Sequence, residues 1–230
     1  MDARSERWRE HRKKVRSEIV DAAFRAIDKR GPDLSVREIA EEAGTAKPKI
    51  YRHFADKDDL FHAIGGRLRD MLGAAIFPAV NLSADSAREV IRSSVEQYVG
   101  LVNEHPNVLR FLIQGRFAVQ SESARRTLNE GREITLAIAE MFNNELREMQ
   151  LDPAAIELAA VATFGTAASA TDWWLGPDDG SPRRMTNDQF VNHLTTIMLG
   201  AIYGTAEALG ITMDPDRPIH EAVPSQQPVA

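Results

Sequence analysis

Apolar residues recur at helical spacing through most of the chain. In the first stretch they stand four positions apart, at Val15, Ile19, Ala23 and Ile27. This spacing predicts an amphipathic helix. The helix is expected to end near Gly31, because Pro32 follows directly.

Two shorter helices are expected next. Ser35 is followed three residues later by Glu38, which is the pattern of a capping box at a helix start. Gly44 supplies a tight turn after this helix. A third helix is expected over residues 46–54, with Thr45 as its N-cap.

The same periodicity continues to the last long helix, and no strand-like alternation interrupts it. The chain is therefore predicted to be all-α, with about nine helices in total. After a fourth helix that Asp56 caps, the later helices are expected at residues 86–104, 108–117, 122–149, 153–174 and 187–209.

Composition refines this picture. The chain has 43% apolar and 27% charged residues, as in ordinary soluble proteins, and it has no cysteine. Disulfides, Cys-ligated zinc and thiol nucleophiles are thereby excluded. The net charge of −6 conceals a division: residues 1–69 hold 17 Lys and Arg against 13 Asp and Glu, whereas residues 70–230 hold 11 against 21. A basic end on an acidic chain points to nucleic acid.

Residues 34–54 have the proportions of a helix-turn-helix, in which the second helix enters the major groove. The start of that helix presents Thr45, Lys47 and Lys49, and Ile50 and Phe54 are expected to face inward. The alternative is an ordinary helical pair with solvated charges. The position of the basic residues and the charge division favour DNA binding.

The segment Ile50-Tyr51-Arg52-His53-Phe54, with Lys57 and Leu60, resembles the DNA-binding signature of the tetracycline-repressor (TetR) family. The resemblance covers about residues 15–64. It implies a homodimeric repressor that binds a palindromic double-stranded operator and is released by a small molecule in its C-terminal domain. Pro48 and Lys49 depart from the small pair that is usual in the family, so the operator sequence is not transferred. The chain also resembles, more faintly, actinobacterial members of a lipid- or alkane-metabolism type.

The predicted organisation has four parts: a basic arm at 1–14, a three-helix DNA-binding head at 15–57, a helical ligand-binding and dimerisation domain at 58–210, and a Pro-rich tail at 211–230. The arm is either a flexible DNA contact or a solubilising overhang. The candidate DNA-binding residues are Ser35, Thr45, Ala46, Lys47, Pro48, Lys49, Tyr51, Arg52, His53 and Lys57.

The C-terminal half offers two further sets of candidates. The candidate ligand-binding residues, for which core packing is the alternative, are Phe111, Phe117, Met141, Phe142, Phe164, Trp173 and Trp174. The candidate dimer-interface residues are small or apolar, which permits close helix packing. They are Ala162, Thr166, Ser169, Ile197, Gly200, Ala201 and Gly204. Apolar inner faces favour a hydrophobic effector such as a fatty acid or acyl derivative.

Other classes of function fit the sequence less well. No catalytic motif or metal-ligand spacing is present, so no enzyme activity, metal or cofactor is predicted. A cytoplasmic protein without a membrane segment is expected, because the N-terminus lacks the apolar core of a signal peptide. The alternatives are a ligand-independent DNA-binding protein or an activator and, more remotely, a helical-bundle enzyme.

Overall fold

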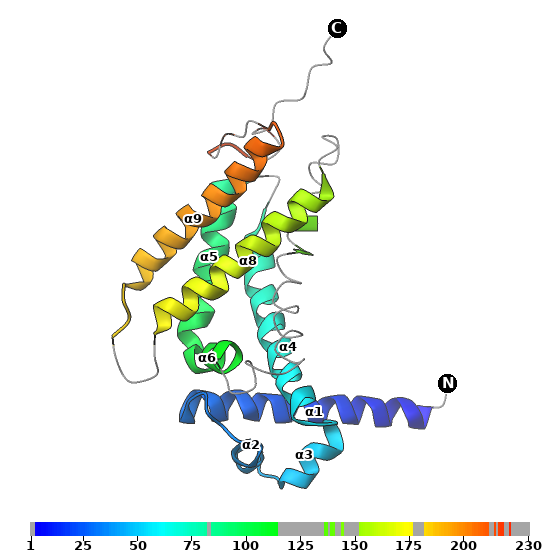
Figure 1. Cartoon of the computed structure of the whole chain (residues 1–230). Helices are drawn as coiled ribbons and strands as arrows, with labels where there is room; N and C mark the ends of the chain where they lie inside the picture. Colours follow the sequence, from blue (N-terminus) through cyan, green and yellow to red (C-terminus); the bar gives the residue numbers. More distant parts are fainter. Residues whose placement is uncertain are drawn as a thin grey trace. The chain divides into compact units, whose positions relative to one another are not determined.

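A computed structural model describes residues 3–81, 84–114, 136–137, 139–140, 144, 152–176, 182–211, 214, 216–218 and 221. These residues form α-helices, one 3-10 helix and connecting turns (Figure 1). The predicted all-α class is confirmed. Within the described ranges the sole β-type pairing is an isolated bridge between Ser86 and Pro218.

The chain divides into two compact units, which are described separately. The first comprises residues 1–69 and 105–130, and the second comprises residues 70–104 and 131–230. The described residues 105–114, which fall within the predicted ligand-binding domain, are thus grouped with α1, α2 and α3.

The first unit is organised around a long helix. Helix α1 (Ala3–Arg30) packs against α2 (Val36–Glu42), α3 (Lys47–His53) and α6 (Pro106–Gln114). The first turns of α4 (Lys57–Ile76) complete the unit. Its core is apolar and is formed by residues that include Ile19, Ala23, Ile27, Ile39, Ile50, Phe54, Leu60, Phe61 and Ile64.

Local sequence signals account for the turn between α2 and α3. Ser35 and Glu38 form the predicted capping box, and Gly44 has a φ of +61°, a conformation that favours glycine. The prediction that Thr45 caps α3 is wrong. The N-cap is Ala46, which makes no side-chain capping bond. Pro48 in the first turn lacks an N–H, so one of the donors that a cap would satisfy is absent.

The N-terminal arm also differs from the prediction. The apolar pattern begins at Val15, but α1 already starts at Ala3. The side chains of residues 6–14 are all exposed, and the first buried side chain is that of Ile19. A helix elongates more easily than it nucleates, so the packed part of α1 can support these additional turns.

The second unit contains α5 (Ala87–Glu104), α8 (Pro153–Leu175), α9 (Asn187–Ala208) and the 3-10 helix η1 (Phe77–Ala79). Helix α9 lies against both α5 and α8 (Figure 1). Asp152 caps α8 by accepting a hydrogen bond from the backbone N–H of Ala154.

Buried contacts join the helices of the second unit. The Tyr98 hydroxyl of α5 lies 2.7 Å from the Thr171 hydroxyl of α8, and burial raises the pKa of Tyr98 to about 12. Trp174 is fully buried, stacks on Phe190 with ring centroids 4.1 Å apart, and donates its indole N–H to the carbonyl of Met185. The predicted helix 122–149 and the tail 211–230 lie largely outside the described residues.

Candidate nucleic-acid interface

Helix α3 has an apolar side and a polar side. Ile50 faces the interior and is completely buried, and Phe54, one turn further on, is buried as well. Lys47, Lys49 and Arg52 of the same helix are exposed to solvent. The helix is thus held by its apolar residues, while its basic residues are exposed to a partner.

The C-terminal end of α3 is held by Arg16 of α1. The Arg16 guanidinium donates to the backbone carbonyl of His53, to Asp59 Oδ2 at 3.0 Å and to Asp59 Oδ1 at 2.8 Å. It also lies over the Phe54 ring, 4.1 Å from its centroid. One side chain therefore connects α1, α3 and α4, and we call this arrangement the Arg16 clasp.

Asp59 is fully engaged within the clasp. Its Oδ2 accepts a hydrogen bond from the backbone N–H of Ala55 at 2.9 Å, and its own N–H donates to Asp56 Oδ1 at 2.7 Å, as expected for the predicted cap of α4. The hydrogen bond from Arg16 is the largest of the effects that hold the pKa of Asp59 below its ordinary value. Asp59 is therefore ionised at neutral pH, and its charge is matched by that of Arg16.

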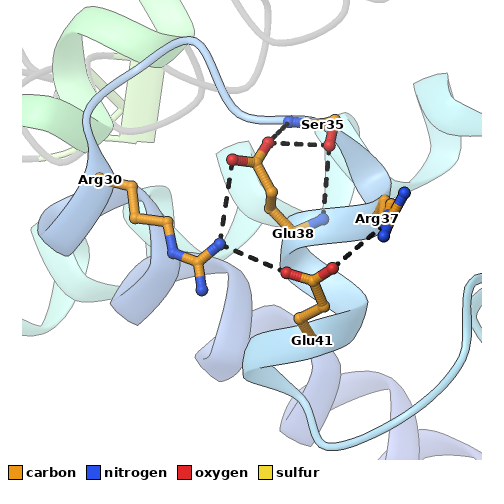
Figure 2. Close-up of polar contacts among 5 residues, drawn as sticks. All are labelled: Arg30, Ser35, Arg37, Glu38 and Glu41. Atoms are coloured by element: carbon orange, nitrogen blue, oxygen red, sulfur yellow. Dashed lines mark hydrogen bonds and ion pairs between the residues drawn. The ribbon is translucent and has the colours of Figure 1, made fainter.

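Acidic residues on α2 are paired with basic residues of α1 and of α2 itself. Figure 2 shows Glu38 accepting from both the backbone N–H and the hydroxyl of Ser35, each at 2.8 Å, and Arg30 reaching Glu38 and Glu41. Arg37 pairs with Glu41 at 3.2 Å. Exposed ion pairs of this kind add little stability individually. Their effect here is to offset the negative charge of α2.

Glu42 continues this pairing. Its Oε1 lies 2.8 Å from Lys29 Nζ and 3.4 Å from Arg25 Nε. The hydrogen bond from Lys29 is the first cause of the lowered pKa of Glu42. Helices α1 and α2 are thus joined by charged contacts in addition to their apolar core.

The basic residues near α3 influence one another. Lys47 Nζ lies 5.9 Å from the centroid of the Tyr51 ring. Burial, followed by the charges of Arg12 and Lys49, lowers the pKa of His53, so its imidazole is neutral at pH 7. Burial also lowers the pKa of Lys57, and the charge of Lys47 lowers it further. Lys47 and Lys57 thus repel each other. A polyanion that lies between such cations relieves the repulsion and is bound favourably.

Most of the predicted DNA-binding residues are thereby brought together. Ala46, Lys47, Pro48, Lys49, Tyr51 and Arg52 are exposed on or beside α3, and Lys57 begins α4. Thr45 and His53 are half-buried. Ser35 lies at the start of α2, where the capping box occupies its hydroxyl.

Sequence reasoning missed Arg16 and Asp59. A signal for Arg16 was present: it stands three and four positions before the buried residues Ile19 and Val20, where helical spacing predicts an apolar side chain. A charge at such a position needs a partner. Asp59, 43 residues away along the chain, could not be identified as that partner without the fold.

Three of the candidate ligand-binding residues, Phe117, Met141 and Phe142, lie outside the described residues. Phe111 is buried in the first unit, with its ring centroid 5.3 Å from that of Phe61. In the second unit Phe164 is half-buried.

The two adjacent tryptophans have different environments. Trp173 is 46% exposed beneath the guanidinium of Arg184, which lies 5.1 Å from its ring centroid. Trp174 packs in the core between Phe190 and Arg183, as the core-packing alternative predicts. Arg183 also donates to the amide oxygen of Asn103, which links this cluster to α5.

The candidate dimer residues lie on α8 and α9, and several of them line a groove. The groove has a volume of about 580 Å³, and its lining includes Ala162, Gly200, Ala201 and Gly204. Leu158, which also lines the groove, is 68% exposed, and Ile197 of α9 is 55% exposed. Helix α8 is long and apolar enough to cross a bilayer by length and composition alone, but the same properties suit a helix that packs on a protein partner.

Over the residues that the structure describes, no group of three or more His, Asp or Glu side chains is placed to hold a metal ion. The charged side chains of the first unit instead pair with one another or surround α3. The arrangement is suited to binding a polyanion rather than to acid–base chemistry.

Comparison with known proteins gives matches along most of the chain. The family model described as "Bacterial regulatory proteins, tetR family" matches residues 19–64, and the one described as "Tetracyclin repressor-like, C-terminal domain" matches residues 87–198. HTH-type transcriptional regulators from two strains of Mycobacterium tuberculosis are each 32% identical over 212 residues, which cover 91% of this chain and 86% of theirs.

Solved structures share the fold. A tetR-family transcriptional regulator from Streptomyces coelicolor matches with a TM-score of 0.65 and 23% identity over 86% of each chain. FadR from Bacillus subtilis, in complex with stearoyl-CoA, matches with a TM-score of 0.59 and 18% identity over 80% of this chain and 98% of that chain.

Proposed function

The chain belongs to the TetR family of bacterial transcriptional regulators, a family of DNA-binding proteins rather than enzymes, and on this premise we propose that it is a dimeric repressor released from its operator by a small hydrophobic effector. The observation that carries the proposal is the exposed basic side of α3. Lys47, Lys49 and Arg52 face solvent, while Ile50 and the Arg16 clasp hold the helix from behind.

Each of these exposed residues has a chemical role in the proposal. Lysine and arginine neutralise phosphates and donate to guanine in the major groove. Tyr51, 38% exposed beside Lys47, adds a hydroxyl and an aromatic face. His53, neutral and half-buried at the end of the helix, is proposed to position this surface rather than to contribute charge.

The proposed dimer forms through α8 and α9. The groove lined by Gly200 and Gly204 is also lined by the exposed side chain of Leu158, and the exposed Ile197 lies on the same helix as the two glycines. Small residues on one protomer and protruding apolar residues on the other allow helices to approach closely. The same contact would cover the apolar face of α8, which favours a protein partner over a membrane and a location in the cytoplasm with the DNA.

The proposed effector is a fatty acid or an acyl derivative. Support comes from the apolar helices of the second unit and from solved relatives of the same fold, which include fatty-acid regulators and a complex with stearoyl-CoA. Candidate contacts are the aromatic residues predicted from the sequence, with the half-buried Phe164 the best placed among the described ones.

DNA binding is tested by fluorescence anisotropy with labelled duplexes that cover the DNA flanking the protein's own gene. Scrambled duplexes of the same composition serve as controls. The proposal predicts one or more duplexes bound at least a thousandfold more tightly than the scrambled ones at physiological salt. Equal affinity for all duplexes would contradict it.

The effector is tested by a thermal-shift screen with fatty acids, acyl-CoA esters and hydrophobic drugs. A true effector raises Tm in proportion to the logarithm of its concentration above Kd, and it also releases the bound duplex. If the duplex is selected but no compound shifts Tm or releases it, the protein is a ligand-independent DNA-binding protein instead.

A further inference from the structure

The N-terminal extension of α1, residues 3–14, projects beyond the packed part of the helix. Its twelve residues span roughly 18 Å at 1.5 Å per residue. The described side chains from Glu6 to Lys14 are exposed, and Trp8 is 67% exposed. The residues of this segment therefore contribute little to the core of the first unit.

Charge is distributed unevenly around this helical extension. Trp8, Arg12 and Arg16 are four residues apart and share one face, and Arg9 lies about 60° from Arg12 at 100° per residue. The acidic residues of the extension lie elsewhere: Glu10 is about 160° from Arg12, and Glu6 about 120°. Glu6 is about 60° from Arg9, at the edge of this face, and Asp59 pairs with Arg16 at its packed end. The part of the face around Trp8 and Arg12 is therefore predominantly basic.

This basic face continues onto the surface of α3. Arg16 lies one turn of α1 after Arg12. Its guanidinium donates to the carbonyl of His53 at the end of α3. Burial and then the charges of Arg12 and Lys49 lower the pKa of His53, so a cation of the extension and a cation of α3 both act on the same imidazole. The extension and the exposed side of α3 thus form one positively charged surface.

We propose that the Trp8–Arg9–Arg12 face of the α1 extension is a second DNA contact that binds backbone phosphates beyond those reached by α3. The inference rests on the proposed function. Guanidinium groups bind phosphate oxygens through two parallel hydrogen bonds, and the Trp8 indole adds one more donor. Because these contacts involve the backbone, they increase affinity for any sequence and lengthen the DNA segment covered.

The test compares two double variants of the full-length protein. Arg9→Ala/Arg12→Ala removes two cations from the basic face, whereas Arg7→Ala/Lys14→Ala removes two from the opposite side of the same helix. Alanine is a good helix former, so both variants keep the extension helical. Circular dichroism and Tm should be unchanged in both.

The readout is the slope of log K against log salt for the selected duplex, with hydroxyl-radical footprinting of the same complex. The wild-type slope should fall in magnitude by about two in Arg9→Ala/Arg12→Ala, since each phosphate contact contributes about 0.9, and the protected segment should shorten. The Arg7→Ala/Lys14→Ala variant should keep both values. Equal losses in the two variants, or no loss in either, would overturn the inference.

Two further outcomes are distinguishable. If the wild-type protein selects no duplex, the proposed function fails, and this inference fails with it. A tryptophan beside arginines also suits an anionic lipid surface. Binding to phosphatidylglycerol vesicles that is lost in Arg9→Ala/Arg12→Ala, while DNA binding is unchanged, would assign the face to lipid and overturn the DNA contact.

Discussion

Arg16 and Asp59 form a two-pronged ion pair, with Nη1 3.0 Å from Oδ2 and Nη2 2.8 Å from Oδ1. The pair joins α1 to α4, and the same guanidinium binds the carbonyl at the end of α3. The end of α3, the proposed recognition helix, is thus linked through Arg16 to a carboxylate that lies outside that helix.

Asp59→Asn should weaken operator binding. Removal of a negative charge near DNA would by itself tighten binding, so a loss identifies a positioning role. We expect a loss of about 1–2 kcal/mol, which is roughly 5- to 30-fold in Kd by fluorescence anisotropy. Asp58→Asn removes the same charge from the adjacent position and should leave binding unchanged or slightly tighter. Tighter binding by both variants would contradict the positioning role.

The Arg16 clasp also makes stability depend on pH. The folded-state pKa of Asp59 is lowered, chiefly by the hydrogen bond from Arg16, so its contribution is fully present above the unfolded pKa of about 3.9. That contribution is lost as the pH falls through the folded pKa. The wild-type protein should therefore be more stable than Asp59→Asn from pH 5 to pH 8, by about 1–2 kcal/mol.

Urea unfolding at a series of pH values measures this difference. The two proteins should converge as the pH falls below about 4, because Asp59 is then increasingly protonated. Arg37→Ala, which removes an exposed partner of Glu41, should change stability by less than about 0.5 kcal/mol at neutral pH. A wild-type advantage that persists undiminished to pH 2 would contradict the assignment.

Lys49→Ala and Tyr51→Ala should affect DNA binding in different ways. If Lys49 binds a phosphate, its loss weakens all duplexes to a similar extent and reduces the salt slope by about one. If Tyr51 contacts a base edge, its loss costs roughly 1–3 kcal/mol on the selected duplex and much less on scrambled DNA. Anisotropy titrations on both duplexes at three salt concentrations separate the two roles. An unchanged affinity removes the residue from the interface.

Bulky substitutions in the groove between α8 and α9 should separate the protomers. A Cβ added at Gly200 or Gly204 meets no atom of the same chain within 4 Å, so Gly200→Leu and Gly204→Leu should retain the helical fold. Each should raise the dimer Kd by tenfold or more, as measured by sedimentation equilibrium. Gly100→Leu on α5 is the matched control, because Gly100 is equally open and lies outside the groove lining. A stable dimer in both groove variants would place the interface elsewhere.

The sequence was sufficient to predict the elements that depend on local signals. The Ser35–Glu38 capping box, the left-handed Gly44 and the cap at Asp152 each follow from residues close together in the chain. The exposed face of α3 also follows, since Ile50 and Phe54 are the apolar residues of that helix and both are buried. Local pattern and helical geometry determine all of these features.

Two kinds of feature could not be predicted: helix ends that no local signal marks, and contacts between residues far apart in the chain. The apolar pattern predicts a start of α1 near Val15, because an exposed helical extension has no apolar stripe to mark it. The N-cap of α3 was misassigned to Thr45 because a good capping side chain does not require the helix to begin beside it. The partners of Arg16 and Trp174 lie 43 and 16 residues away along the chain, where spacing carries no information.

The three tryptophans provide the protein with built-in optical probes. The indole of Trp174 is sealed from water between Phe190 and Arg183, so its emission is at short wavelength and is protected from iodide. Trp8, exposed on the α1 extension, emits at longer wavelength and is open to the quencher. Trp173 of the second unit is 46% exposed and is also open to the quencher. With Trp173 replaced by Phe, steady-state fluorescence can therefore report separately on events at the α1 extension and in the core of the second unit.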